Sequence, residues 1–149
     1  MEIIRSVVPR DFESWLSLWE KYNSFYKRTI LSEITKETWK RFLDPQEPVF
    51  AFVVEQESQI IGFVHYLFHR HTALMTNSCH LQDLYVLESA RGHGVGTSLI
   101  ELVADQATKA GSPSIYWMTQ ESNETARKLY DQVAKKSEFI VYYKRPEAT

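Results

Sequence analysis

The sequence predicts an α/β fold with one domain, residues 1–149, whose mixed, mostly antiparallel sheet is flanked by helices. Some segments alternate apolar and polar side chains as strands do, while others repeat apolar residues at helical spacing. Only three residues separate the strand-like segments 49–55 and 59–69, which is typical of an antiparallel hairpin. From residue 78 to 119, a strand, a glycine-rich turn, a helix and another strand follow one another, which predicts one parallel βαβ unit.

The first third of the chain predicts a strand and two helices. Residues 2–8 are rich in β-branched side chains, and we expect a strand there. Pro9 suits the first turn of a helix, and apolar residues recur at helical spacing from Phe12 to Tyr26. We expect residues 28–33 to form a loop, and a short helix to run from Thr35 to just before Pro45.

After the hairpin, the pattern predicts a strand, a helix, a strand, a helix and a closing strand. Gly111 is a suitable stop for the first of these helices, and Ser122 or Asn123 can cap the second. The five elements span residues 78–87, 94–110, 113–119, 123–133 and 137–145.

Composition excludes several classes of protein. Hydrophobic residues make up 44% of the chain, which is enough for a packed core. The net charge of −2 shows no basic excess, so we expect no binding to nucleic acid. Neither a signal peptide nor a membrane span is recognisable, so we expect a cytoplasmic protein that does not bind membranes. Cys79 is the single cysteine, which rules out an internal disulfide.

A cluster of glycines lies between a predicted strand and a predicted helix. Gly92, Gly94 and Gly96 alternate with other residues directly after Arg91. The N-terminus of a helix carries unpaired N–H groups and partial positive charge, and glycine lets a ligand approach the backbone. The cluster therefore predicts a site for an anion, usually a phosphate, to which Arg91 can add a charged contact.

Two common phosphate-binding loops fit this cluster poorly. A P-loop needs a lysine after its last glycine, whereas Gly96 is followed by Thr97 and Ser98. The dinucleotide-binding fingerprint needs G-x-G-x-x-G and an acidic residue about twenty positions later. Here the spacing is G-x-G-x-G, and the later position falls around Tyr116 and Trp117.

The sequence "RGHGVG" resembles the pyrophosphate loop of the GNAT superfamily of acetyl-CoA-dependent N-acetyltransferases. "HLQDLYV" is similar to the strand that leads into that loop, and "NETARKLYDQVAKKSEFIVYYK" to the helix and closing strand that follow it. The resemblance covers nearly the whole chain and implies a GNAT-like fold. The ending "LYDQVA…FIVY" most resembles the histone-and-polyamine-acetyltransferase-like branch.

The resemblance implies that acetyl-CoA is the co-substrate. A zinc site at His65, His69, His71 and His80 lacks the support of a C-x-x-C or H-x-x-x-H motif, so we expect no metal. Backbone N–H groups of the loop would hold the pyrophosphate, and the strand before it would pair with the pantetheine arm as an added strand does. The residues implied in coenzyme binding are Leu84, Tyr85, Val86, Arg91, Gly92, His93, Gly94, Val95, Gly96, Thr97, Asn123, Ala126 and Tyr130.

Acetyl transfer needs a neutral amine, a donor for the oxyanion and a proton for the leaving thiolate. The resemblance places Tyr130 near the sulfur, where its phenol can donate that proton. The base is open, because Gln82 stands where some relatives carry a glutamate, and an amide cannot take a proton. Strict strand alternation puts His80 and Gln82 on one face and Asp83 on the other. His80, Asp83 or a water relay remain as candidates.

We expect the acceptor to be a primary amine: a polyamine, another small amine, or a lysine side chain or N-terminus of a protein. The sequence does not choose between them. The resemblance implies an acceptor cleft bordered by Tyr22, Phe25 and Tyr26, with Gln82 also placed to bind substrate. We expect the amine to attack the thioester directly, because no activated cysteine is evident. Relatives often pair, so we expect a homodimer. The alternative function is a non-catalytic acyl-CoA-binding sensor or scaffold.

Overall fold

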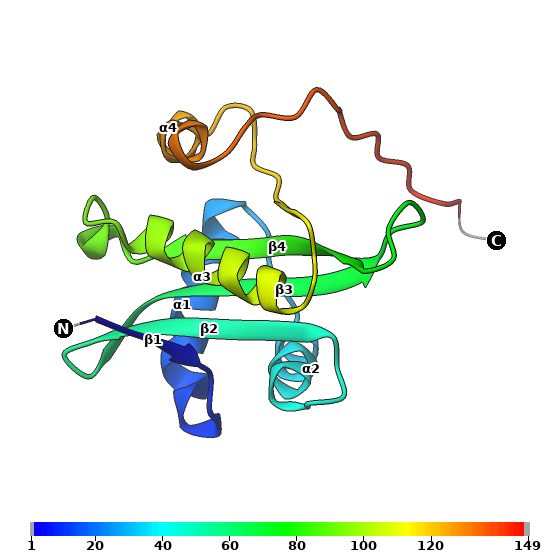
Figure 1. Cartoon of the computed structure of the whole chain (residues 1–149). Coiled ribbons are helices and arrows are strands. Elements are labelled where there is room, and N and C mark those ends of the chain that lie inside the picture. Colours follow the sequence, from blue (N-terminus) through cyan, green and yellow to red (C-terminus); the bar gives the residue numbers. More distant parts are fainter. Residues whose placement is uncertain (1, 148–149) are drawn as a thin grey trace. The chain divides into compact units, whose positions relative to one another are not determined.

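A five-stranded sheet with the strand order β1–β2–β3–β4–β5 forms the centre of the first part of the chain. Figure 1 labels its first four strands. In this computed structural model, residues 2–147 are described, and they form two units, residues 2–118 and 119–147. Neighbouring strands are antiparallel except β4 and β5, which are parallel. The strands are β1 (Glu2–Ser6), β2 (Val49–Gln56), β3 (Gln59–Arg70), β4 (Asn77–Val86) and β5 (Ile115–Tyr116). The predicted fold class is confirmed.

Three longer helices cover the sheet of the first unit. Helices α1 (Phe12–Phe25) and α2 (Ser32–Leu43) lie on one side of it, and α3 (Val95–Lys109) lies on the other (Figure 1). Short 3₁₀ turns, Pro9–Asp11 and Glu88–Ala90, precede α1 and α3. The predicted parallel βαβ unit is therefore present, with α3 joining β4 to β5.

The core has two faces, because alternate residues of each strand point to opposite sides of the sheet. On the α1 and α2 side, Trp15 and Trp39 pack with Val53 and Phe63 in one buried cluster. Buried residues outside this cluster include Val64 on β3 and, on α3, Val95, Leu99 and Val103. Trp15 and Phe63 have no solvent-exposed surface at all.

Several predicted boundaries were wrong. Helix α2 begins at Ser32 rather than Thr35, since the Leu31 carbonyl already accepts hydrogen bonds from the N–H groups of Ile34 and Thr35. Strand β1 ends at Ser6 instead of residue 8. Strand β5 has two residues instead of the predicted seven, because only Ile115 and Tyr116 have partners on β4.

The second unit contains helix α4 (Glu124–Val133) and an extended segment without a strand. Asn123 is the N-cap of α4, as predicted, and its Oδ1 accepts a hydrogen bond from the Ala126 N–H at 3.4 Å. The predicted closing strand, residues 137–145, was wrong: no residue described there is in a strand. A strand needs a partner edge as well as β-propensity, and residues 119–147 offer none within their own unit.

Gly111 has a φ of +78° directly after α3, which confirms the predicted helix stop. Within residues 2–147, no helix has both the length and the apolar character needed to cross a membrane.

Candidate active site

The parallel pairing of β4 and β5 covers only two residues of each strand. Cys79 pairs with Ile115 and His80 with Tyr116, while β4 continues to Val86. Beyond His80, this edge of β4 has no strand beside it among the residues described. Leu84, Tyr85 and Val86, which were predicted to pair with the pantetheine arm, all lie on this open stretch. An extended ligand can add to such an edge through main-chain hydrogen bonds.

The glycine loop lies between β4 and α3 and has a left-handed backbone. Gly92 has a φ of +84° and Gly94 a φ of +82°, values that favour glycine. A Cβ atom at either position would meet no other atom within 4 Å, so the space beside the loop is open. The positive φ angles, rather than a lack of space for a side chain, therefore explain why glycine occupies positions 92 and 94.

Gly94 is also the N-cap of α3, and no side chain caps this terminus. Helix geometry leaves the first N–H groups, those of Val95, Gly96 and Thr97, without partners inside the helix. The positive end of the helix dipole adds to the attraction of these N–H groups for an anion. These donors, with an open approach over Gly92 and Gly94, suit an anion such as a phosphate, and the role of the loop toward the coenzyme stays a prediction.

Arg91 ties the loop to the end of β4. Its Nε–H donates to the Val86 carbonyl at 2.8 Å, and its guanidinium carbon lies 5.5 Å from the centre of the Tyr85 ring. Within residues 2–147, no hydrogen bond engages its two Nη groups. Part of Arg91 thus has a structural role that the sequence did not indicate, and the Nη groups retain the predicted capacity for a phosphate.

A β-bulge in β4 changes which residues share a face. His65 on β3 pairs with Asp83, but the next residue, Tyr66, pairs with Leu81, so Gln82 is an extra residue without a partner. His80, which pairs with Leu67, therefore lies on the same face as His65 and Asp83. The expectation that Asp83 faces away from His80 was wrong, since it assumed strict alternation through Gln82.

A buried chain of hydrogen bonds connects α1 to this face. The Trp15 Nε1–H donates to His65 Nε2 at 3.0 Å, and His65 Nδ1 lies 2.9 Å from Asp83 Oδ2. An indole N–H can only donate, so His65 Nε2 carries no proton. His65 is therefore the neutral tautomer protonated on Nδ1, and it donates to the Asp83 carboxylate.

Asp83 is held as an anion. Burial alone would raise its pKa, but hydrogen bonds from His65 and from the Tyr22 hydroxyl, at 2.8 Å, together with the charge of Arg28, lower the pKa below its usual value. Burial, and then the charge of Asp83, raise the pKa of Tyr22. A carboxylate with a lowered pKa is a weak proton acceptor and a good partner for a cation.

His80 lies beside a second polar cluster. Its ring stacks on Tyr116, with centroids 4.6 Å apart and planes inclined by 3°. The Tyr116 hydroxyl is 2.7 Å from His69 Nε2. Burial, and then repulsion from His69, lower the pKa of His80 below its usual value despite the charge of Asp83. A neutral imidazole able to accept a proton therefore predominates at neutral pH.

The predicted acceptor residues have different surroundings. Tyr22 is buried, with its hydroxyl on Asp83, so it supports the site rather than lining an open cleft. Tyr26 packs between Tyr22 and Phe25, and Phe25 is 56% exposed. Gln82 is exposed in the bulge.

Arg28 was missed by the sequence interpretation. It belongs to the connection expected to be a plain loop, and its guanidinium carbon lies 5.7 Å from the ring centres of both Tyr22 and Tyr26. The clearest sequence signal for Arg28 was its position two residues after Tyr26, a predicted acceptor residue. No hydrophobic periodicity marks it. The sequence interpretation also assigned His65 no catalytic or binding role. Within residues 2–147, no cluster of three or more histidine, cysteine or acidic side chains could hold a metal ion.

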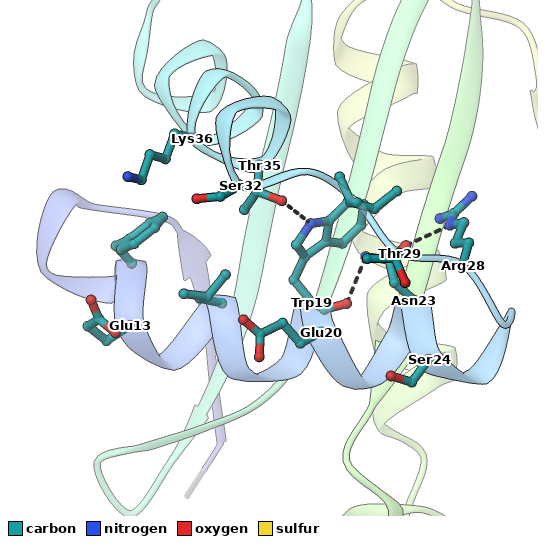
Figure 2. A pocket seen from close by; sticks show the side chains of 13 residues that line it. Glu13, Trp19, Glu20, Asn23, Ser24, Arg28, Thr29, Ser32, Thr35 and Lys36 are labelled. Carbon is teal, nitrogen blue, oxygen red and sulfur yellow. Dashed lines mark hydrogen bonds between the residues drawn. The ribbon is translucent and has the colours of Figure 1, made fainter.

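A pocket of about 570 Å³ opens between α1 and α2. Figure 2 shows Trp19 inside it, with the indole N–H donating to the Thr35 hydroxyl at 3.2 Å, and Arg28 near the start of the connecting loop. Its wall carries both acidic and basic side chains, namely Glu13, Glu20, Arg28 and Lys36.

The remaining predicted residues, Asn123, Ala126 and Tyr130, belong to the second unit. Asn123 and Ala126 form the cap of α4, which accounts for their spacing. Tyr130 lies on the same helix, and its carbonyl accepts from the Ala134 N–H at 2.9 Å. Their roles toward the coenzyme stay predictions.

Comparison with known proteins identifies the family. The model of the Acetyltransferase (GNAT) family matches residues 12–134. The chain belongs to the GNAT family. It is 37% identical over 142 residues to D-amino-acid N-acetyltransferase HPA3 of Saccharomyces cerevisiae, covering 94% of this chain and 88% of the relative. It is 27% identical to the uncharacterized N-acetyltransferase YhfO of Bacillus subtilis, covering 87% and 86%.

Solved structures share the GNAT fold. AAC(6')-Iy in complex with a bisubstrate analog superposes with a TM-score of 0.85 at 18% identity, over 98% of this chain and 99% of that one. A ribosomal-protein-alanine N-acetyltransferase from Brucella melitensis gives a TM-score of 0.83 at 21% identity, over 97% and 99%. This GNAT protein is an acetyl-CoA-dependent N-acetyltransferase, as predicted.

Proposed function

We propose that this GNAT enzyme transfers the acetyl group of acetyl-CoA to the amino group of a free amino acid, including D-amino acids. The 37% identity to a D-amino-acid N-acetyltransferase, over 94% of the chain, carries this proposal. A fixed anion, Asp83, beside the open edge of β4 supports it, because a small ammonium group needs such a counter-charge. Amino acids are thus preferred over the polyamine and protein acceptors that the sequence left open.

The glycine loop and the open edge of β4 hold acetyl-CoA. The N–H groups at the start of α3 bind the pyrophosphate, and the backbone of Leu84, Tyr85 and Val86 pairs with the pantetheine arm. Asn123, Ala126 and Tyr130 contact the coenzyme from α4. This division of roles rests on the family resemblance and on the geometry of the loop.

Asp83 binds the acceptor's ammonium group and does not remove its proton. The two neutral donors, His65 and Tyr22, orient both carboxylate oxygens, and a carboxylate has further lone pairs for a third donor. The lowered pKa of Asp83 keeps the charge in place over the working pH range. In this role the carboxylate orients the amine at the bulge, next to the open edge.

His80 is the proposed base. It lies on the face of Asp83, and its lowered pKa keeps it neutral at neutral pH. The bound ammonium group first gives one proton to His80, and the lone pair that this frees forms the C–N bond to the acetyl carbon. The C–S bond then breaks, the departing thiolate takes a proton from Tyr130, and the second proton that the nitrogen loses returns to the Tyr130 phenolate.

Direct attack is preferred to an acetyl-enzyme. Cys79 has no exposed surface, and burial raises the pKa of its thiol to about 11, so little thiolate forms at neutral pH. Membership of the family and the named relative argue against the alternative of a non-catalytic sensor. The resemblance of the C-terminal segment to the histone-and-polyamine-acetyltransferase-like branch, and a homodimer, stay proposals drawn from the family.

Thiol release from acetyl-CoA across a panel of acceptors tests the proposal. The panel contains D- and L-amino acids, a polyamine and a lysine-containing peptide, and mass spectrometry identifies each acetylated product. We expect the highest kcat/KM for free amino acids. Efficient release with the polyamine or the peptide alone, or binding of acetyl-CoA without release, would refute the proposed acceptor.

A further inference from the structure

We infer that Arg28 is the binding residue for the acceptor's carboxylate, so that an amino acid is recognised as a zwitterion between Arg28 and Asp83. This inference rests on the proposed function. It adds a residue that the coenzyme and proton-transfer roles do not use, together with a reason why the enzyme would prefer amino acids to amines that lack a carboxylate.

Arg28 is fixed in place by a buried neighbour. Its Nε–H donates to Asn23 Oδ1 at 2.6 Å, and its backbone N–H donates to the Asn23 carbonyl at 3.1 Å. Asn23 is itself buried, and its side-chain amide donates to the Trp19 carbonyl at 2.8 Å. Such a held guanidinium loses less entropy on binding a ligand than a free surface arginine does.

The outer end of Arg28 remains available. Within residues 2–147, no hydrogen bond or ion pair engages its Nη groups. These N–H donors form a planar fork that matches the two oxygens of a carboxylate. The Tyr22 and Tyr26 rings, each 5.7 Å from the guanidinium carbon, support one side of the group. Arg28 is exposed, so a ligand from solution can reach this fork. It also lines the pocket between α1 and α2, whose lining includes neither Tyr22 nor Asp83.

Tyr22 connects the two charges. Its ring lies next to the Arg28 guanidinium, and its hydroxyl donates to Asp83 at 2.8 Å. No ion pair joins Arg28 to Asp83 in the part of the chain that is described, so neither charge neutralises the other by contact. A cation and an anion held apart across one tyrosine ring suit a ligand whose two oppositely charged groups are bonded to the same carbon atom. A polyamine would instead bring a second positive charge toward Arg28.

The test compares an amino acid with its primary amide, which keeps the amine and lacks the carboxylate. The best amino acid of the acceptor panel and its amide are assayed with wild type, Arg28→Gln and, as the matched control, Lys27→Asn. Lys27 is the exposed neighbouring cation with a φ of +54°, a conformation that asparagine tolerates. Within each variant the ratio of the two kcat/KM values does not depend on the fraction of active enzyme.

We expect the wild-type ratio to favour the amino acid and to fall about 10- to 100-fold in Arg28→Gln, the usual effect of one charge-assisted contact, while kcat/KM for the amide stays nearly constant. Lys27→Asn should keep the wild-type ratio. The ratio for Arg28→Lys should lie between the ratios for wild type and Arg28→Gln, because lysine keeps the charge but loses the hydrogen bond to Asn23.

An unchanged ratio in Arg28→Gln, or an equal fall in Lys27→Asn, would overturn the inference and leave amino-acid acetylation intact. A wild-type enzyme that acetylates other amines but neither the amino acid nor its amide would instead refute the proposed function, and the inference with it.

Discussion

The two units of the chain differ in how their apolar residues are used. In residues 2–118, aromatic side chains such as Trp15 and Phe63 are fully buried between the sheet and its helices. In residues 119–147, α4 has no buried residue, and Phe139 to Tyr143 are each at least 72% exposed. The first unit therefore carries the site elements that depend on exact packing, while the second adds a helix that carries the proposed acid, Tyr130.

The largest expected effect is on the stability of the first unit. Phe63 contacts Trp19, Tyr22, His65 and Tyr85, so Phe63→Ala leaves a cavity directly beneath the network on Asp83. We expect the free energy of unfolding to fall by about 3–5 kcal/mol. Urea denaturation measures the free energy of unfolding. A decrease smaller than about 1 kcal/mol would show that Phe63 is not packed as described.

A catalytic role for the second unit is tested by Tyr130→Phe, which removes only the hydroxyl. If the phenol protonates the leaving thiolate, kcat should fall about 10²-fold, with little change in acetyl-CoA affinity. Single-turnover assays and calorimetry measure the two quantities. Full activity, under conditions where the chemical step limits the rate, would remove Tyr130 from the mechanism and confine catalysis to the first unit.

The base belongs to the first unit if His80 is correctly assigned. His80 must be neutral to accept a proton, so kcat/KM should rise as the pH increases through its pKa, which burial and His69 lower below 6.5. His80→Ala should remove that limb and lower kcat/KM about tenfold or more. The pH profiles of the two proteins give the answer. Superimposable pH profiles of kcat/KM would show that water or another group, and not His80, accepts the proton.

The smallest expected effect is on the stability of the second unit. Phe139 is 92% exposed, so Phe139→Ala should change the free energy of unfolding by less than about 0.5 kcal/mol. Phe63→Ala provides the matched comparison in the same denaturation assay. A loss of several kcal/mol for Phe139→Ala would mean that this residue packs against a partner, and the contrast between the two units would disappear.

Features that depend on neighbouring residues were predictable from the sequence. The hairpin between β2 and β3 follows from its short connection, and Gly94 and Gly111 mark the start and end of α3. The glycine loop was recognisable for the same reason, because the glycines and the helix start that create its geometry adjoin in the chain. Asn123 likewise caps α4 from within its own segment.

Features that depend on distant partners were not predictable. The bulge at Gln82 exists only in register with His65 and Tyr66, so the sequence placed Asp83 on the wrong face. The tautomer of His65 depends on Trp15, fifty positions away. Residues 137–145 have strand propensity, but the residues described there form no strand, because strand formation requires an edge that composition does not reveal.

The central claim is that Asp83, held as an anion by His65 and Tyr22, binds the acceptor's ammonium group. Steady-state kinetics of Asp83→Asn with a free amino acid at saturating acetyl-CoA test it most directly. The asparagine side chain has nearly the same shape without the charge, so we expect kcat/KM for the acceptor to fall about 10²-fold or more, with coenzyme affinity nearly unchanged. A folded Asp83→Asn enzyme with wild-type kcat/KM for the amino acid would contradict the account.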